Sequence, residues 1–139
     1  MEEKRILAID YGSKRIGIAI TDPLNIFAYP LITLTNDNKF FDNLKKILLQ
    51  YKVVKILIGS PLKENGEESV TSQSVNKFIE ELKKNVQIEI ELVDERYSSE
   101  IARQRIIESV VSKKKRRDKS LIDKNAAAVI LEDYLKSMQ

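Results

Sequence analysis

The chain of 139 residues contains no cysteine and no histidine. Without cysteine, neither a disulfide framework nor a thiolate zinc site can form. The absence of histidine also excludes Ser-His-Asp and Cys-His triads, histidine general bases and histidine-rich metal sites. Any hydrolysis must therefore rely on carboxylates, lysine, hydroxyl groups or a metal ion bound by oxygen. Hard oxygen ligands select magnesium, manganese or calcium over zinc or copper.

Long apolar runs are also absent. No segment approaches the roughly 20 apolar residues that span a bilayer, and the opening residues lack the layout of a signal peptide. We therefore expect a soluble protein of the cytoplasm. The length fits one domain, since domains cluster near roughly 100–150 residues. We predict a single domain over residues 1–139.

The net charge of +3 is distributed unevenly. Residues 113–119 hold six cations and one acid, which gives this segment a net charge of +5 and leaves −2 for the rest of the chain. Such a concentration favours a local contact with a polyanion. Offsetting the carboxyl end of the preceding helix is the alternative function of these charges. The candidate phosphate-binding residues here are Lys113, Lys114, Lys115, Arg116 and Arg117.

The hydrophobic pattern predicts an α/β fold. Apolar or alternating runs predict strands at residues 4–11, 15–21, 31–34, 53–58 and 88–93. Helical spacing predicts helices over residues 37–51, 70–84, 98–110 and 121–136, the first of them capped by Asn36. A hairpin followed by strands alternating with helices gives a mixed sheet with helices on both faces. The carboxyl ends of its parallel strands meet at one edge, where sites form.

Two acidic residues are predicted at that edge. Asp10 ends an otherwise apolar strand, where a carboxylate is costly unless it is paired, hydrogen-bonded or bound to a metal. It either accepts N–H groups from the turn at Gly12 or serves the site. Glu95 follows the fifth strand, and it either reaches the same edge as Asp10 or pairs with Arg96 or Lys14.

A third acid, Asp123, has two interpretations. Ser120 and Asp123 fit a capping box at the start of the last helix. Asp123 also shares a helix face with Ala127 and Ile130, which predicts that it is directed toward the sheet. Both functions can coexist.

Asp10, Glu95 and Asp123 brought together would provide a magnesium or manganese site. Two such ions about 4 Å apart activate a water and stabilise the leaving oxygen of a phosphodiester. Lys14 and Arg15, in the turn beside Asp10, are suited to contact a phosphate, and Arg96 beside Glu95 is a further candidate.

Four blocks of this sequence resemble the YqgF family, also called RuvX: ILAIDYGSKRIGIAITD, ILIGSPLKENG, LVDERYSSEIA and IDKNAAAVILEDYL. The resemblance implies an RNase H-like fold with a five-stranded sheet of order 3-2-1-4-5. It also implies a cytoplasmic bacterial nuclease that processes the 5′ end of the 16S ribosomal RNA precursor. The family's acidic triad falls on Asp10, Glu95 and Asp123, and its basic loop on residues 113–119. The sequence departs from the family pattern in loops, at Ser60 and Glu67 among others.

Several functions remain open at this point. The first is a metal-dependent endonuclease acting on precursor ribosomal RNA, free or in a pre-ribosomal particle, as a monomer or homodimer. The same chemistry on branched DNA, as in a Holliday junction resolvase, would require a dimer with two active sites. A non-catalytic RNA-binding factor for ribosome assembly is the second class. A third is an ATP-binding protein of the actin and sugar-kinase type, which needs a second similar lobe.

Overall fold

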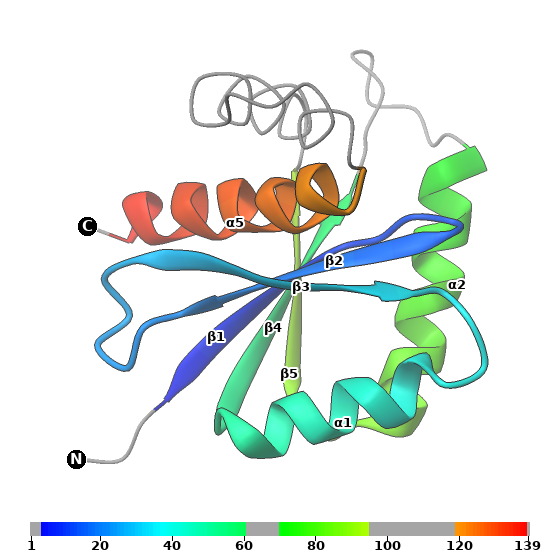
Figure 1. Ribbon diagram of the computed structural model, residues 1–139, viewed down its shortest axis with the longest axis horizontal. Coiled ribbons are helices and arrows are strands. Elements are labelled where there is room, and N and C mark those ends of the chain that lie inside the picture. The colour runs from blue at the N-terminus through cyan, green and yellow to red at the C-terminus, as the bar shows by residue number, and fades with distance from the viewer. Residues whose placement is uncertain (1–3, 61–69, 95–118, 139) are drawn as a thin grey trace.

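The structure is a computed structural model, and it describes residues 4–60, 70–94 and 119–138. The elements along the chain (Figure 1) are β1 (Arg5–Asp10), β2 (Arg15–Thr21), β3 (Ala28–Thr35), α1 (Phe40–Gln50), β4 (Val53–Ser60), α2 (Val70–Asn85), β5 (Glu89–Asp94) and α5 (Lys119–Ser137). The predicted helix over residues 98–110 lies outside the described residues.

The five strands form one sheet in the order β3-β2-β1-β4-β5. Strands β1 and β2 pair as an antiparallel hairpin, and β3 continues antiparallel to β2. Strand β4 runs parallel to β1 on one side and to β5 on the other. The predicted mixed sheet and its strand order are thus confirmed. The carboxyl ends of β1, β4 and β5 lie along one side of the sheet, called here the carboxyl edge.

Helices cover both faces of the sheet, as the sequence predicted (Figure 1). On one face, α1 and α2 pack against the large aliphatic side chains of the central strands, in a cluster that includes Leu7, Ile9, Ile18, Ile56, Leu44 and Leu82. On the other face, α5 packs against Ala8, Ala19 and Leu57. Successive residues of a strand point to opposite faces. In β1, Leu7 and Ile9 therefore face α1 and α2, and Ala8 between them faces α5.

Helix α5 approaches the sheet through small side chains. Ala127 and Ala128 share a cluster with Ala8 and Ala19, and all four are buried. Residues 126–131 of the helix are all buried, which is the pattern of a helix enclosed on more than one side. No helix in the described part of the chain is both long and apolar enough to cross a membrane.

Most boundaries differ from the sequence prediction by one or two residues, and three of the differences have a bearing on the fold. Strand β3 begins at Ala28 and contains Pro30, because an edge strand tolerates a residue without an N–H, and the pairing with β2 shifts there. Strand β5 spans Glu89–Asp94, one residue later than predicted. Helix α1 begins at Phe40, with Lys39 at its N-cap and no side-chain cap, so the cap predicted at Asn36 is wrong.

The start of β1 is held to the end of β2 by a buried hydroxyl. Thr21 has no exposed surface, and its Oγ1 accepts the N–H of Ile6 at 2.9 Å and donates to Oδ1 of Asn25 at 2.5 Å. Asn25 has a positive φ of 56° and donates its Nδ2 to the carbonyl of Lys4 at 2.7 Å. One side chain thus joins the amino end of the central strand to the β2–β3 turn.

We expect Thr21→Val to lower the free energy of unfolding by about 1–3 kcal/mol, because the N–H of Ile6 would be left buried without an acceptor. Denaturant unfolding measures the change. Thr21→Ser keeps the hydroxyl and should retain most of this stability. Thr21→Val keeps the methyl group, so a stability of Thr21→Val equal to that of the parent would contradict the hydrogen-bond account.

Candidate active site

Asp10 is the last residue of β1, at the centre of the carboxyl edge. The alternation along β1 places Asp10 on the same face as Ala8, which is the face that α5 covers. Its partner in β2 is Gly17, which has no side chain to fill the space beside the carboxylate. Asp10 is half-buried. Its backbone is paired with β2, and Ile9 before it is paired with β4, while the alternation directs its side chain toward the helix layer.

The turn after Asp10 is tied to the end of β3. Asn36 donates its Nδ2 to the carbonyl of Gly12 at 3.0 Å, and its backbone N–H donates to the carbonyl of Lys14 at 2.9 Å. The side chain that the sequence predicted to cap α1 thus serves the turn instead, and Oδ1 of Asp37 accepts the N–H of Lys39 at 3.0 Å. Sequence patterns gave no signal for this contact, since it joins residues 24 apart.

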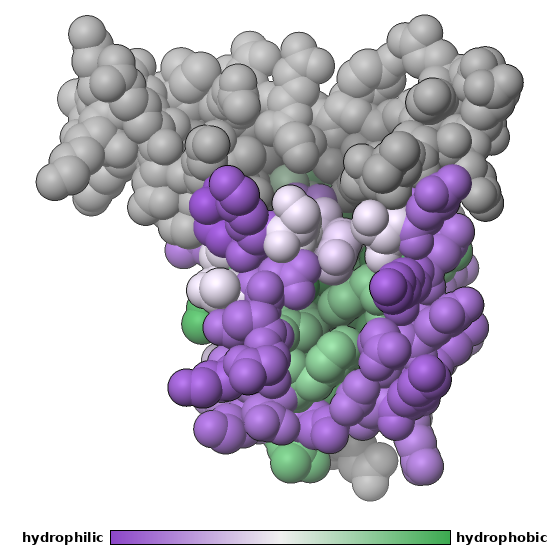
Figure 2. Space-filling model, turned by 90° about the vertical axis from the view of Figure 1, so that its right-hand side faces the viewer, coloured by the Kyte–Doolittle hydropathy of each residue, from purple (hydrophilic) through white to green (hydrophobic). Residues whose placement is uncertain are grey.

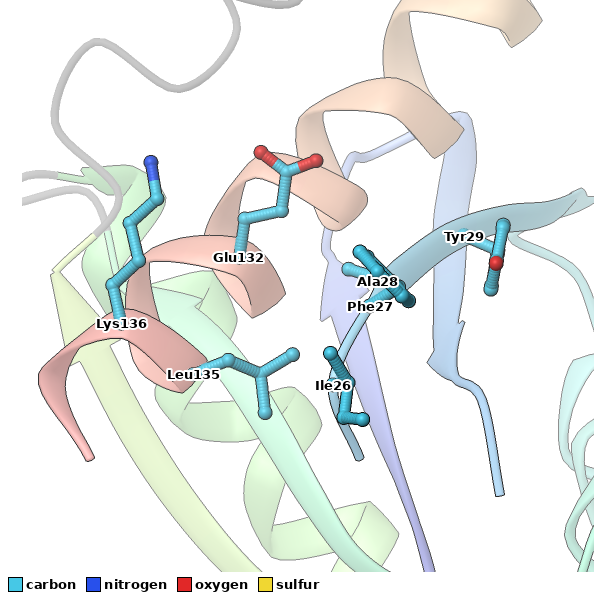
Figure 3. Close-up of a pocket in the computed structure, with 7 residues that line it drawn as sticks. All are labelled: Ile26, Phe27, Ala28, Tyr29, Glu132, Leu135 and Lys136. Carbon is cyan, nitrogen blue, oxygen red and sulfur yellow. The ribbon is translucent and has the colours of Figure 1, made fainter. Parts of the chain in front are cut away.

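The carboxyl end of helix α5 lies at the end of the sheet opposite to the carboxyl edge. There its residues Glu132, Leu135 and Lys136 and residues 26–29 enclose a pocket of about 350 Å³ (Figure 3). This pocket lies by the β2–β3 turn, the end of the sheet where Thr21 meets Ile6. A helix of 19 residues extends about 28 Å. The amino end of α5 therefore lies toward the carboxyl edge, the arrangement visible in Figure 1.

A lysine holds the helix in this orientation. Lys55 of β4 donates its Nζ to the hydroxyl of Tyr134 at 2.7 Å and pairs with Oε2 of Glu91 at 2.9 Å. The hydrogen bond to Tyr134, and then that to Glu91, raise the pKa of Lys55 above its ordinary value. The lysine is therefore charged throughout the neutral range, and it joins α5 to both β4 and β5.

Residue 123 lies one turn before Ala127, about 6 Å along the helix axis. Asp10 lies two residues beyond Ala8, about 7 Å along β1. Because Ala127 and Ala8 belong to one buried cluster, both steps lead from that cluster toward the carboxyl edge. The helix already includes Lys119, so Ser120 is not its N-cap and the capping box predicted with Asp123 is wrong. The side chain of Asp123 is outside what the structure describes.

The other predicted acid follows β5. Ile9 pairs with Ile58, and Ile58 pairs with Leu92, so Asp10 is level with Val93. The parallel pairing on which the prediction for Glu95 depended is thus confirmed. Glu95 itself lies outside the described residues. So do the predicted phosphate contacts Arg96, Lys113, Lys114, Lys115, Arg116 and Arg117.

The two cations of the β1–β2 turn are described. Lys14 is exposed in the turn, and Arg15 begins β2 opposite Thr35 and is half-buried. Among described residues, no three acidic, histidine or cysteine side chains are grouped closely enough to hold a metal ion. Of the three predicted acids, Asp10 is the one whose side chain the structure describes.

The family described as RuvX, Holliday junction resolvase, matches residues 4–137. A protein of Flavobacterium psychrophilum is 44% identical over 132 residues, covering 94% of this chain and 96% of its own. One from Sulfurihydrogenibium is 40% identical over 133 residues, covering 94% and 89%. Both relatives are provisionally named pre-16S rRNA nuclease.

Solved structures resemble the fold at low sequence identity. The Fowlpox virus resolvase in complex with its substrate, Holliday junction DNA, has a TM-score of 0.56 at 14% identity, covering 96% of this chain and 98% of that one. RuvC of Thermus thermophilus, bound to a Holliday junction substrate, has a TM-score of 0.54 at 12% identity, covering 97% and 96%. These likenesses show an RNase H-like fold.

We expect Gly12→Ala to disturb the turn beside Asp10, because the added Cβ would lie 2.4 Å from the backbone oxygen of Arg15. The turn must shift, at a cost of about 1–3 kcal/mol in the free energy of unfolding. Denaturant unfolding gives the loss, and amide chemical shifts should change mainly in the β1–β2 turn and at Asn36. Ser13→Ala, at an exposed position of the same turn, is the matched control. An unchanged stability for Gly12→Ala would contradict this close approach.

Proposed function

The chain belongs to the RuvX (Holliday junction resolvase) family, which makes it a nuclease of RNase H-like fold, and we propose that it hydrolyses phosphodiester bonds with divalent metal ions held by Asp10, Glu95 and Asp123. The observation that carries this proposal is the position of Asp10. It is a half-buried carboxylate at the centre of the carboxyl edge, on the face covered by α5.

We propose that the two other acids belong to the same site. Val93 packs on the α5 side of the sheet and is level with Asp10. Continuing the alternation of β5 by two residues would direct Glu95 to that side also. Strands β1 and β5 are separated by β4, a distance of about 10 Å between their backbones. Residue 123 approaches from α5, so the three acids would surround one space from three elements.

The donor set suits magnesium or manganese. It consists of carboxylates from a chain without histidine or cysteine, and oxygen-only ligands are typical of hard divalent ions. Such ions, when bound, lower the pKa of a water and offset the negative charge that develops on the phosphate. The chain itself would hold the ions by Asp10, Glu95 and Asp123 and keep the edge in register through Asn36 and the contacts of Lys55.

Precursor 16S ribosomal RNA is the substrate that we propose, with cleavage at its 5′ end. The provisional names of the relatives at 44% and 40% identity support this choice. Lys14 and Arg15 beside Asp10, with Arg96 and the cations at 113–117, would contact the phosphates. We propose that the reaction takes place in the cytoplasm, on free precursor or on a pre-ribosomal particle.

Branched DNA is the second candidate substrate, because the family description and the two solved neighbours name Holliday junctions. Symmetric resolution of a four-way junction needs two active sites, and hence two copies of this chain. The two substrates therefore differ in the oligomeric state that they require.

We expect the chain to cut an end-labelled RNA that carries the 16S precursor leader when magnesium is present. Asp10→Asn, Glu95→Gln and Asp123→Asn should each lower the rate by roughly a hundredfold or more, because metal-assisted charge stabilisation contributes several kcal/mol. Asp42→Asn, at an exposed position of α1, is the matched control and should cut like the parent.

A four-way DNA junction assayed in parallel decides between the substrates. Variants that cut as well as the parent would remove the acidic site from the proposal. Binding of RNA without cleavage, also on assembled pre-ribosomal particles, would favour a non-catalytic assembly factor.

The basic segment should control the salt dependence of binding. Replacing Lys113, Lys114, Lys115, Arg116 and Arg117 by serine should weaken RNA binding and flatten its logarithmic dependence on salt. The slope should fall by roughly 0.7 for each phosphate of a single strand that the variant no longer neutralises. Fluorescence anisotropy over a salt series measures this, and Lys45→Ser with Lys46→Ser, exposed on α1, is the control. An unchanged slope would show that the segment does not contact phosphates.

A further inference from the structure

A second hollow opens at the carboxyl edge, on the face opposite to α5. It has a volume of about 340 Å³ and is lined by Tyr11 and Asn36 near the β1–β2 turn, by Phe41 of α1, and by α2 through Lys77, Phe78 and Glu81. Figure 2 looks onto the side where the β1–β2 turn and α2 lie, and it shows a hydrophobic strip between hydrophilic walls. The volume is at the lower end of the range of small-molecule pockets, roughly 300–1,000 Å³.

Three aromatic rings form the apolar part of this pocket. The centroid of the Phe78 ring is 4.7 Å from that of Tyr11 and 5.9 Å from that of Phe41, which it stacks at an interplanar angle of 18°. Phe78 is buried, whereas Tyr11 and Phe41 are half-exposed. The rings pack directly on Phe78, so the open volume lies beside them. Here two partly exposed rings line a hollow large enough for a planar ligand.

The polar rim of the pocket suits a nucleotide. Lys77 is exposed and has no ion-pair partner in the described part of the chain, so its charge is available to a phosphate. Glu81 lies 3.8 Å from Lys84 in a surface pair, and such pairs are weak. Its carboxylate can accept a hydrogen bond from an exocyclic amino group of a base. The amide of Asn36 already donates to Gly12, which leaves its oxygen as an acceptor.

The pocket adjoins Asp10 through one residue. Tyr11 follows Asp10 directly, and it packs with the α1 and α2 cluster, while Asp10 lies on the α5 face. A strand passing the carboxyl edge at Asp10 would therefore meet Tyr11 on the other side of β1. Aromatic side chains that stack unpaired bases are a general means of binding single-stranded nucleic acid.

From this geometry we infer that the pocket between the β1–β2 turn, α1 and α2 is a subsite for one unpaired nucleobase, which stacks on Tyr11 and Phe41 with its phosphate at Lys77. The choice of ligand rests on the proposed nuclease function. The subsite favours a base with an exocyclic amino group, and it requires the substrate to be single-stranded beside the bond that is cut.

The test is binding of an oligouridylate that carries one central 2-aminopurine, in EDTA so that no cleavage takes place. The chain has no tryptophan, so the fluorescence of 2-aminopurine is read without interference. We expect quenching on binding. Tyr11→Leu and Phe41→Leu, which keep apolar volume, should remove the quenching and raise Kd roughly five- to hundredfold, the range for loss of one base–aromatic stack. Phe27→Leu, at an exposed aromatic outside this pocket, should do neither.

A second variant avoids the aromatic cluster. Lys77→Ala should raise Kd by a few fold and lower the salt slope by roughly 0.7, the value for one phosphate of a single strand, whereas Lys83→Ala, exposed on the same helix, should leave both unchanged. Competition by adenosine monophosphate distinguishes a free nucleotide from a base held within a strand. A DNA strand of the same sequence shows whether the pocket distinguishes ribose from deoxyribose.

The inference is overturned if both leucine variants quench and bind like the parent, or if a strand with an abasic site in place of 2-aminopurine binds equally tightly. Loss of the subsite with magnesium-dependent cleavage intact would leave the nuclease proposal standing. Stacking without cleavage of any substrate would retain the subsite and remove the nuclease proposal.

Discussion

The close contact between α5 and the central strands is the constraint on which the site depends. Small side chains meet there, with Ala8 and Ala19 on the sheet and Ala127 and Ala128 on the helix. Alanines allow the helix backbone to lie near the strands, and a larger residue in this close-packed layer would displace the helix. Residue 123 and Asp10 are each reached by a short step from this cluster, so the approach of α5 to the sheet affects the distance between their backbones.

The central position of β1 has a second consequence. The strand is hydrogen-bonded on both sides, by β2 and β4, and covered on both faces, so its last residue is held more firmly than a residue of an edge strand. A catalytic carboxylate benefits from such support, since reacting groups must be held within fractions of an ångström. The turn that follows is joined to β3 through Asn36. This hydrogen bond restrains the turn that directly follows Asp10.

The two faces of β1 present different chemistry at the carboxyl edge. The α5 face presents the acid, and the α1 and α2 face presents aromatic rings and a lysine. Successive residues, Asp10 and Tyr11, belong to the two faces because a strand alternates. On the proposed function, a nucleic acid lying across this edge would meet Asp10 on one side and the aromatic rings on the other.

The sequence by itself determined the α/β class and the strands and helices of the described residues, because hydrophobic periodicity is a local property. The metal-binding function of Asp10, Glu95 and Asp123 stays a prediction from composition and spacing. Asp10 was evident as a charge within an apolar strand. Patterns failed where the partner is distant. Asn36 resembled a helix cap but bonds to Gly12, and Ser120 resembled a cap but lies inside α5. The aromatic pocket also went unpredicted, since Tyr11, Phe41 and Phe78 come from three separate parts of the chain. Only tertiary packing decided these contacts, because the competition between a local cap and a distant acceptor is settled by which groups the folded chain brings within hydrogen-bonding reach.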